Sequence, residues 1–87
     1  MNMYRKNVLN QLKETFNILF DDYKDELSLH EIFNMSKEYE IGTWKEQIED
    51  YKSNSDEIDF DIKDAIKLCK TMIKELSKIK ITDIVNQ

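Results

Sequence analysis

The chain has 87 residues, with 18 acidic and 13 basic side chains and a formal net charge of −5, and this length predicts one domain. One glycine and no proline exclude collagen-like chains and Pro/Gly-rich disordered tracts. No run of 18 apolar residues is present to span a membrane, the first residues lack the apolar segment of a secretory signal, and Cys69 has no cysteine partner, so we expect a cytoplasmic protein.

The first predicted helix extends from about residue 3 to residue 25. Its apolar residues recur at steps of three and four, and at 100° per residue they fall within an arc of about 120°. Ile18 lies outside this arc. The arc predicts a face directed toward the core, which consists of Val8, Leu9, Leu12, Phe16, Leu19, Phe20 and Tyr23.

The second predicted helix starts at Ser28, which is followed three residues later by Glu31. This spacing is typical of a capping box, in which each side chain accepts a hydrogen bond from the other residue's backbone N–H. We expect the helix to end at Gly42, the only glycine of the chain, because glycine favours the left-handed residue that follows a helix. Its expected core face contains Leu29, Ile32, Phe33, Ser36 and Tyr39.

A short third helix is predicted to follow directly. Thr43 and Glu46 repeat the capping-box spacing at its start. Polar, turn-forming residues at 52–57 predict the loop that ends it. Its expected apolar stripe contains Trp44, Ile48 and Tyr51.

The last predicted helix follows this loop and is the most clearly amphipathic. Asp59 or Asp61 is expected to cap its start, and a further turn is expected at residues 82–85. At 100° per residue its apolar side chains share an arc of about 140°, and its lysines lie opposite them. The apolar set is Ile62, Ala65, Ile66, Cys69, Met72, Ile73, Leu76 and Ile79, and the lysines are Lys63, Lys67, Lys70, Lys74 and Lys78.

Each of these four segments has one apolar side, and they can bury those sides only against one another. Alternation of apolar and polar residues is confined to residues 58–62, which lack a convincing partner strand. The predicted fold is therefore all-α, a small bundle of three to four amphipathic helices with short turns, in a single helical domain over residues 1–87.

We expect no catalytic site, metal or cofactor, and the chain is not predicted to be an enzyme. His30 has no second histidine or cysteine in helical register, so a zinc site is not expected. Cys69 lies in the apolar arc of the last helix, which is typical of a small buried hydrophobe. The acids at residues 56–61 lack the glycine that a calcium-binding EF-hand loop requires.

The charges are unevenly distributed along the chain. Residues 1–13 and 62–87 each carry a net charge of +3, whereas residues 14–61 carry 15 acids and four lysines, a net charge of −11. Such a concentration destabilises a compact fold through self-repulsion, so it indicates either solubility alone or a surface that docks on a basic partner. The candidate binding residues are Asp21, Asp22, Asp25, Glu26, Glu46, Glu49, Asp50, Asp56, Glu57, Asp59 and Asp61, with Trp44 and Tyr51 as candidate aromatic anchors.

This pattern predicts a small acidic protein-binding module or inhibitor. Its expected partner is a protein with a basic surface, such as one that handles nucleic acid. Immunity proteins, antitoxins and phage anti-defence proteins have a similar size and charge, and no motif assigns the chain to any of these families.

Two alternatives use other features of the chain. A nucleic-acid-binding regulator would combine Arg5, Lys6 and Lys13 with the lysines of the last helix, provided that the two helices pack side by side. A homo-oligomeric scaffold, such as a homodimer, would pair the basic last helix with the acidic middle of another copy. Residues 28–51 have the order of a helix-turn-helix, but the second helix carries three acids and one lysine, which disfavours direct DNA binding.

Overall fold

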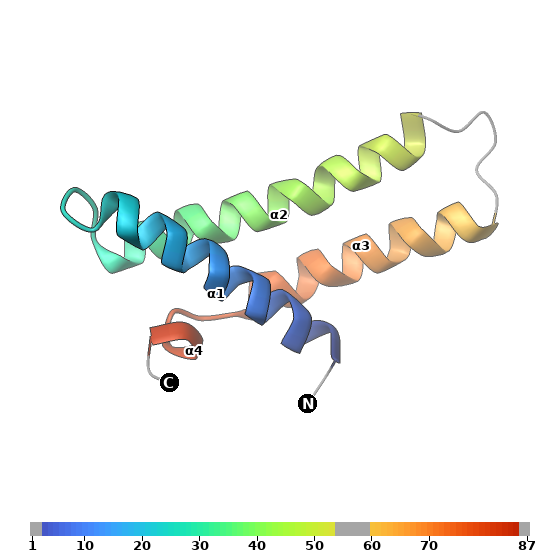
Figure 1. Cartoon of the computed structure of the whole chain (residues 1–87). Helices are drawn as coiled ribbons and strands as arrows, with labels where there is room; N and C mark the ends of the chain where they lie inside the picture. Colours follow the sequence, from blue (N-terminus) through green and yellow to red (C-terminus); the bar gives the residue numbers. More distant parts are fainter. Residues whose placement is uncertain (1–2, 54–59, 86–87) are drawn as a thin grey trace.

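Three long helices and one short helix make up the computed structural model of the chain, which describes residues 3–53 and 60–85. Figure 1 shows α1 (Met3–Tyr23), α2 (Leu29–Ser53), α3 (Phe60–Lys78) and the single turn α4 (Thr82–Val85). The predicted all-α bundle is confirmed, and so is the last turn at residues 82–85. The proposed capping residue Asp59 lies outside the described residues.

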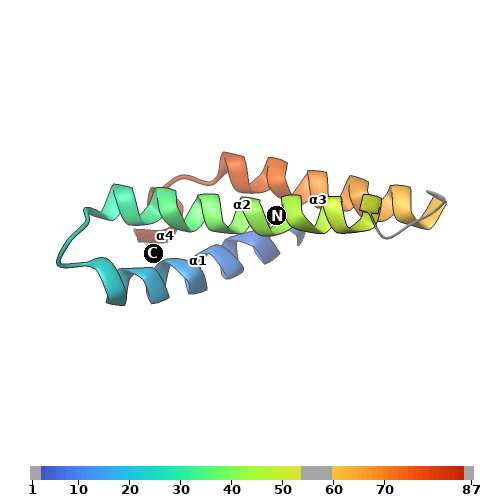
Figure 2. The same ribbon diagram turned by 90° about the horizontal axis from the view of Figure 1, so that it is seen from above.

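The helices form an elongated arrangement in which α2 and α3 run antiparallel and α1 packs across one end of the pair (Figures 1 and 2). The other end extends past α1 as a two-helix arm, which consists of the last turns of α2 and the first turns of α3 (Figure 1). The principal dimensions are 48 × 29 × 15 Å, and the radius of gyration of the Cα atoms is 14.9 Å. A compact domain of this length has a radius of about 12 Å, so the arm accounts for the difference.

The core consists of two clusters. The larger cluster joins α1, α2 and α3 and includes Leu12, Ile32 and Leu76, which are fully buried. The smaller cluster, Ile48, Ile66 and Cys69, lies between α2 and α3. Trp44 is half-buried and packs against both clusters, so it links the arm to the three-helix end. The apolar arcs predicted for the first and last helices therefore form the core.

The predicted break at Gly42 is wrong, because α2 is one helix of 25 residues that continues through it. Gly42 does not have a positive φ, and the Thr43 hydroxyl donates a 3.1 Å hydrogen bond to the Tyr39 carbonyl oxygen instead of capping a new helix. Packing of both halves of α2 against α3 outweighs the roughly 1 kcal/mol that a glycine costs inside a helix. The helix-turn-helix order therefore does not exist in the structure.

The start of α2 agrees with the prediction, but part of its expected core face does not. Glu31 accepts a 3.1 Å hydrogen bond from the Ser28 backbone N–H, and Ser28 Oγ accepts a 3.2 Å bond from the Glu31 N–H, which confirms the capping box. Leu29 and Tyr39, however, are 42% and 65% exposed. The buried row of α2 has a spacing of four residues, and it places Tyr39 outside the core. This row contains Ile32, Ser36 and Glu40.

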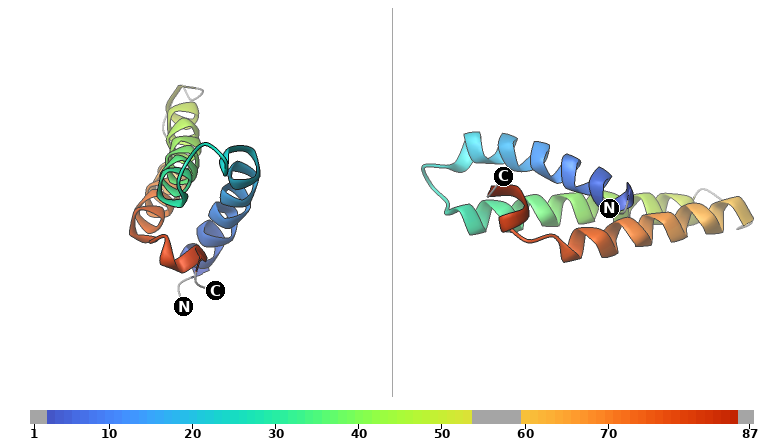
Figure 3. Two further views of the ribbon diagram at one scale, coloured as in Figure 1. Left: turned by 90° about the vertical axis from the view of Figure 1, so that its left-hand side faces the viewer. Right: turned by 90° about the horizontal axis from the view of Figure 1, so that it is seen from below.

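Helix α4 is linked to the first turns of α1 at the three-helix end of the molecule (Figure 3). Arg5 of α1 forms a 3.2 Å ion pair with Asp83 of α4, and Asp83 also accepts a 2.9 Å hydrogen bond from the Lys80 backbone N–H. Arg5 thus has a structural role that fixes α4 against α1.

Candidate protein-binding surface

The predicted acidic residues lie in two groups at opposite ends of the long axis. Four exposed acids surround the turn between α1 and α2, and another group lies on the arm (Figure 1). Asp56, Glu57 and Asp59 lie outside the described residues. The first group is Asp21, Asp22, Asp25 and Glu26, and the second is Glu46, Glu49 and Asp50 on α2 with Asp61 at the start of α3.

Exposed acids on α2 connect the two groups. At 100° per residue, Glu31 and Glu38 lie on the same side of α2 as the arm acids, within an arc of about 120° that contains no lysine or arginine. The acids therefore form a continuous strip, which we call the acidic face. It consists of Asp21, Asp22, Asp25, Glu26, Glu31, Glu38, Glu46, Glu49 and Asp50.

An apolar hollow lies beside this strip, between α1 and α2. Ile18 and Tyr39 line it and are 64% and 65% exposed, which is high for large apolar side chains. Thr15 and Leu19 complete the lining, and the volume is about 270 Å³. We call this feature the Ile18–Tyr39 hollow.

Carboxylates flank the Ile18–Tyr39 hollow on α1. Glu14, Asp21 and Asp22 stand four residues before, three after and four after Ile18, so they lie on the same side of the helix. On α2, Glu38 lines a different hollow, between α2 and α3. The arrangement is an exposed apolar centre with an acidic rim on its α1 side, and the charge pattern of the sequence does not indicate this centre. The position of Ile18 outside the apolar arc was the feature of the sequence that could have indicated this exposed centre.

The two predicted aromatic anchors have different environments. Trp44 is half-buried and packs against both core clusters, so only part of its side chain is exposed. Tyr51 is 37% exposed near the end of α2, although the sequence predicted that it faces the core. Tyr39, which was assigned to the core, is the more exposed aromatic residue of α2.

Glu40 is a buried acid behind the hollow, next to Tyr39 in the sequence. Its side chain belongs to the buried row of α2, and the residue is only 8% exposed. Burial raises the pKa of the Glu40 carboxyl group, and the negative charge of Glu14 raises it further. Glu31 shows the opposite effect, because its hydrogen bonds from Ser28 lower its carboxyl pKa.

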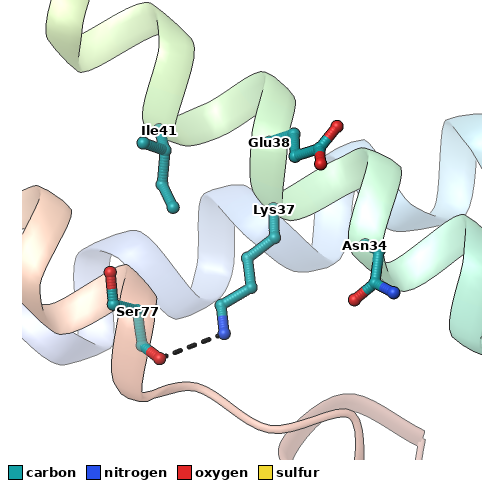
Figure 4. Close-up of a pocket in the computed structure, with 5 residues that line it drawn as sticks. All are labelled: Asn34, Lys37, Glu38, Ile41 and Ser77. Carbon is teal, nitrogen blue, oxygen red and sulfur yellow. Dashed lines mark hydrogen bonds between the residues drawn. The ribbon is translucent and has the colours of Figure 1, made fainter.

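A second hollow, of about 280 Å³, lies between α2 and the end of α3 (Figure 4). Lys37 reaches across it and donates hydrogen bonds of 3.1 Å and 2.8 Å to the carbonyl oxygens of Ser77 and Ile79. These carbonyls lie at the C-terminus of α3, where helical partners are lacking and a cation is favourable. Partial burial lowers the pKa of the Lys37 ammonium group. The Lys37 side chain therefore extends through this hollow and holds α2 against the end of α3.

Cys69 and His30 were considered for catalysis or metal binding, and the structure shows the environment of both. Cys69 is 3% exposed and burial raises the pKa of its thiol, so it remains protonated at neutral pH, as suits a core residue. His30 is exposed in the first turn of α2. Residues 3–53 and 60–85 contain no cluster of three or more histidine, cysteine or acidic side chains that can hold a metal ion.

None of the described helices is long and apolar enough to cross a membrane. No protein-family model, no curated protein and no solved structure matches this chain. The described surface presents an exposed apolar pair with carboxylates along its α1 side, and apolar centres with polar rims are typical of protein-binding sites.

Proposed function

We propose that the chain is a small protein-binding module that docks its acidic face on a basic protein. The Ile18–Tyr39 hollow carries the proposal, because it adds an exposed apolar centre to a surface that otherwise offers only charge. Such a centre supplies affinity when a partner side chain fills it and expels water. The surrounding carboxylates supply orientation and speed of association.

The placement of the charges supports separate roles for the apolar centre, which supplies affinity, and the carboxylates, which supply orientation and speed of association. The acids are exposed at the rim, so they attract a basic surface at long range while keeping their hydration in the complex. Burying acids at the centre would cost free energy unless each one found a partner. Ile18 and Tyr39 are uncharged, so burying them at the centre of an interface does not carry that cost.

The chemistry of the acidic face also indicates the kind of partner. It follows α2, which has 25 residues and is therefore about 37 Å long at 1.5 Å per residue. A long, linear array of negative charge resembles a nucleic-acid backbone in its electrostatics. We therefore propose that the partner handles nucleic acid and that binding inhibits it, as expected for an immunity, antitoxin or phage anti-defence protein.

The test uses three single variants of the full chain. The partner is first captured from the source cells and purified, and the dissociation constant is then measured by calorimetry. Ile18→Ala and Tyr39→Ala are each expected to raise the Kd by about tenfold or more, the effect of losing about 1–2 kcal/mol at a central contact. Leu68→Ala is the matched control, because Leu68 is 41% exposed on α3, outside both the hollow and the acidic face.

Two results would contradict the proposal. One is a partner whose contact surface is acidic. The other is a Kd that is unchanged in Ile18→Ala and Tyr39→Ala, since the hollow would then lie outside the interface.

A further inference from the structure

A second charged surface lies on α3. Five exposed lysines follow one side of this helix, and from Lys63 to Lys78 they extend over about 22 Å at 1.5 Å per residue. We call them the lysine stripe. The residues of α3 that pack against α1, such as Met72 and Leu76, are on the opposite side of the helix. The stripe consists of Lys63, Lys67, Lys70, Lys74 and Lys78.

Helix α2 adds two lysines to this surface. Lys45 and Lys52 are exposed, and at 100° per residue they lie within about 60° of Ile48, which contacts α3 in the smaller core cluster. They therefore project along the edge of α2 that borders α3. A shallow hollow of about 320 Å³ on this side is lined by Lys63, Ile66, Lys67 and Lys70. The stripe together with Lys45 and Lys52 forms the lysine face.

The lysine stripe is not explained by a stabilising effect of its lysines on α3. Successive lysines are three or four residues apart, which places four like-charged pairs in contact positions, and such pairs destabilise a helix. Glu75 lies 3.9 Å from Lys78, and Asp64 lines a hollow with Lys67, so five lysines face fewer acids and the stripe keeps an excess of positive charge. An ordinary solvated face alternates charges of both signs.

We propose that the lysine face binds the phosphate backbone of duplex nucleic acid without reading its sequence. A linear row of ammonium groups matches the row of phosphates along a duplex, and release of bound counterions drives such binding. Among the described residues, Tyr4 is an exposed aromatic side chain that lines a hollow with Lys67, whereas single-stranded ligands stack successive bases on several aromatic side chains, which disfavours a single-stranded ligand. Leu68, which is 41% exposed, lines the same hollow, but an interfacial membrane helix inserts a whole apolar face, which disfavours a lipid surface.

The negative net charge does not prevent this contact, because the lysine stripe of α3 and the acids of α1 are on different sides of the molecule. The acids of α1 and the α1–α2 turn are on the side of the molecule that carries the Ile18–Tyr39 hollow. Charges more than about 8 Å apart are largely screened at physiological salt, and the smaller molecular dimensions are 29 and 15 Å. Glu38 and Glu49 border the lysine face along α2, so they direct the phosphates toward α3.

The test compares two double variants with the same net charge. Lys67→Gln/Lys70→Gln removes the middle of the stripe, whereas Lys24→Gln/Lys80→Gln removes two exposed lysines from the α1–α2 turn and the segment between α3 and α4. Binding to a fluorescent duplex of about 30 base pairs is followed by anisotropy from about 50 to 200 mM salt, a range over which phosphate contacts weaken steeply. Circular dichroism checks that each variant is folded.

For the wild type we expect a log K that falls linearly with log salt. In Lys67→Gln/Lys70→Gln the slope should decrease in magnitude by about 1.8, from two contacts at about 0.9 each, and affinity at 50 mM salt should fall by about ten- to a hundredfold. The control pair should change affinity by less than about threefold, because its lysines make no phosphate contacts in the proposed complex.

Three results would overturn the proposal. The first is no duplex binding by the wild type at 50 mM salt, and the second is an equal loss in both double variants, which would show a net-charge effect only. The third is binding to vesicles of anionic phospholipid without binding to the duplex. Tyr39→Ala should bind the duplex like the wild type, so this test is independent of the proposed function.

Discussion

Glu40 shows how one buried carboxyl group affects the stability of the bundle. Its pKa is raised in the folded state by burial and by Glu14, so the folded protein holds this proton more tightly than the unfolded chain. The resulting cost is absent below the usual carboxyl pKa, grows as the pH rises toward the raised value, and is fully present above it.

Replacement of Glu40 by glutamine should remove this cost. We expect Glu40→Gln to increase the free energy of unfolding at pH 7, with a smaller gain at pH 4, where the wild-type carboxyl group is largely protonated. Urea denaturation at the two pH values measures the difference. Glu38→Gln is the control, because Glu38 is an exposed acid of the same helix and should change stability little. A gain from Glu40→Gln that is larger at pH 4 than at pH 7 would contradict this account.

Helix α2 separates what local sequence signals can predict from what tertiary packing decides. The capping box at Ser28 depends on two residues three apart, and the structure confirms it. The predicted end at Gly42 rested on equally local signals, but both halves of α2 pack against α3 and keep the helix continuous. The same continuity rotates Tyr39 out of the core, which no local pattern indicates.

Gly42 offers a direct test of the continuous helix. A Cβ atom at this position would meet no atom within 4 Å, and the φ angle is not positive. We therefore expect Gly42→Ala to stabilise the protein by about 1 kcal/mol, because alanine is the better helix former. For a domain of this size that gain raises the Tm by about 4–8 °C, which calorimetry measures.

Gly42→Pro is the complementary variant. Proline inside a helix costs about 3 kcal/mol or more, so it should lower the Tm strongly if α2 is continuous. A stable Gly42→Pro protein together with a destabilised Gly42→Ala protein would show that α2 ends at Gly42.

The whole molecule has two differently charged surfaces that the linear charge pattern predicts only in part. The acidic middle and basic end of the sequence were evident, and amphipathic spacing correctly placed the lysines of α3 on an exposed side. Lys45 and Lys52 lie beside these lysines because of the way α2 pairs with α3. The same pairing places the acids in two groups. No fixed spacing of residues along the sequence predicts how two helices pair.

The proposed functions of the two surfaces are compatible with each other. A basic protein that handles nucleic acid would meet the acidic face, while a duplex outside the site that the acidic face covers would lie within reach of the lysine face. The elongated shape, with a longest dimension of 48 Å, separates the turn between α1 and α2 from the arm and leaves room for both contacts.

Docking of the acidic face on a basic protein is tested most directly by the association rate with the purified partner as a function of salt. Electrostatic attraction predicts a rate constant that falls steeply, by about tenfold or more, between low and physiological salt, while dissociation changes little. Glu38→Gln/Glu46→Gln should lower the association rate, whereas Tyr39→Ala should mainly accelerate dissociation. An association rate that is independent of salt, and equal in the wild type and Glu38→Gln/Glu46→Gln, would contradict the account.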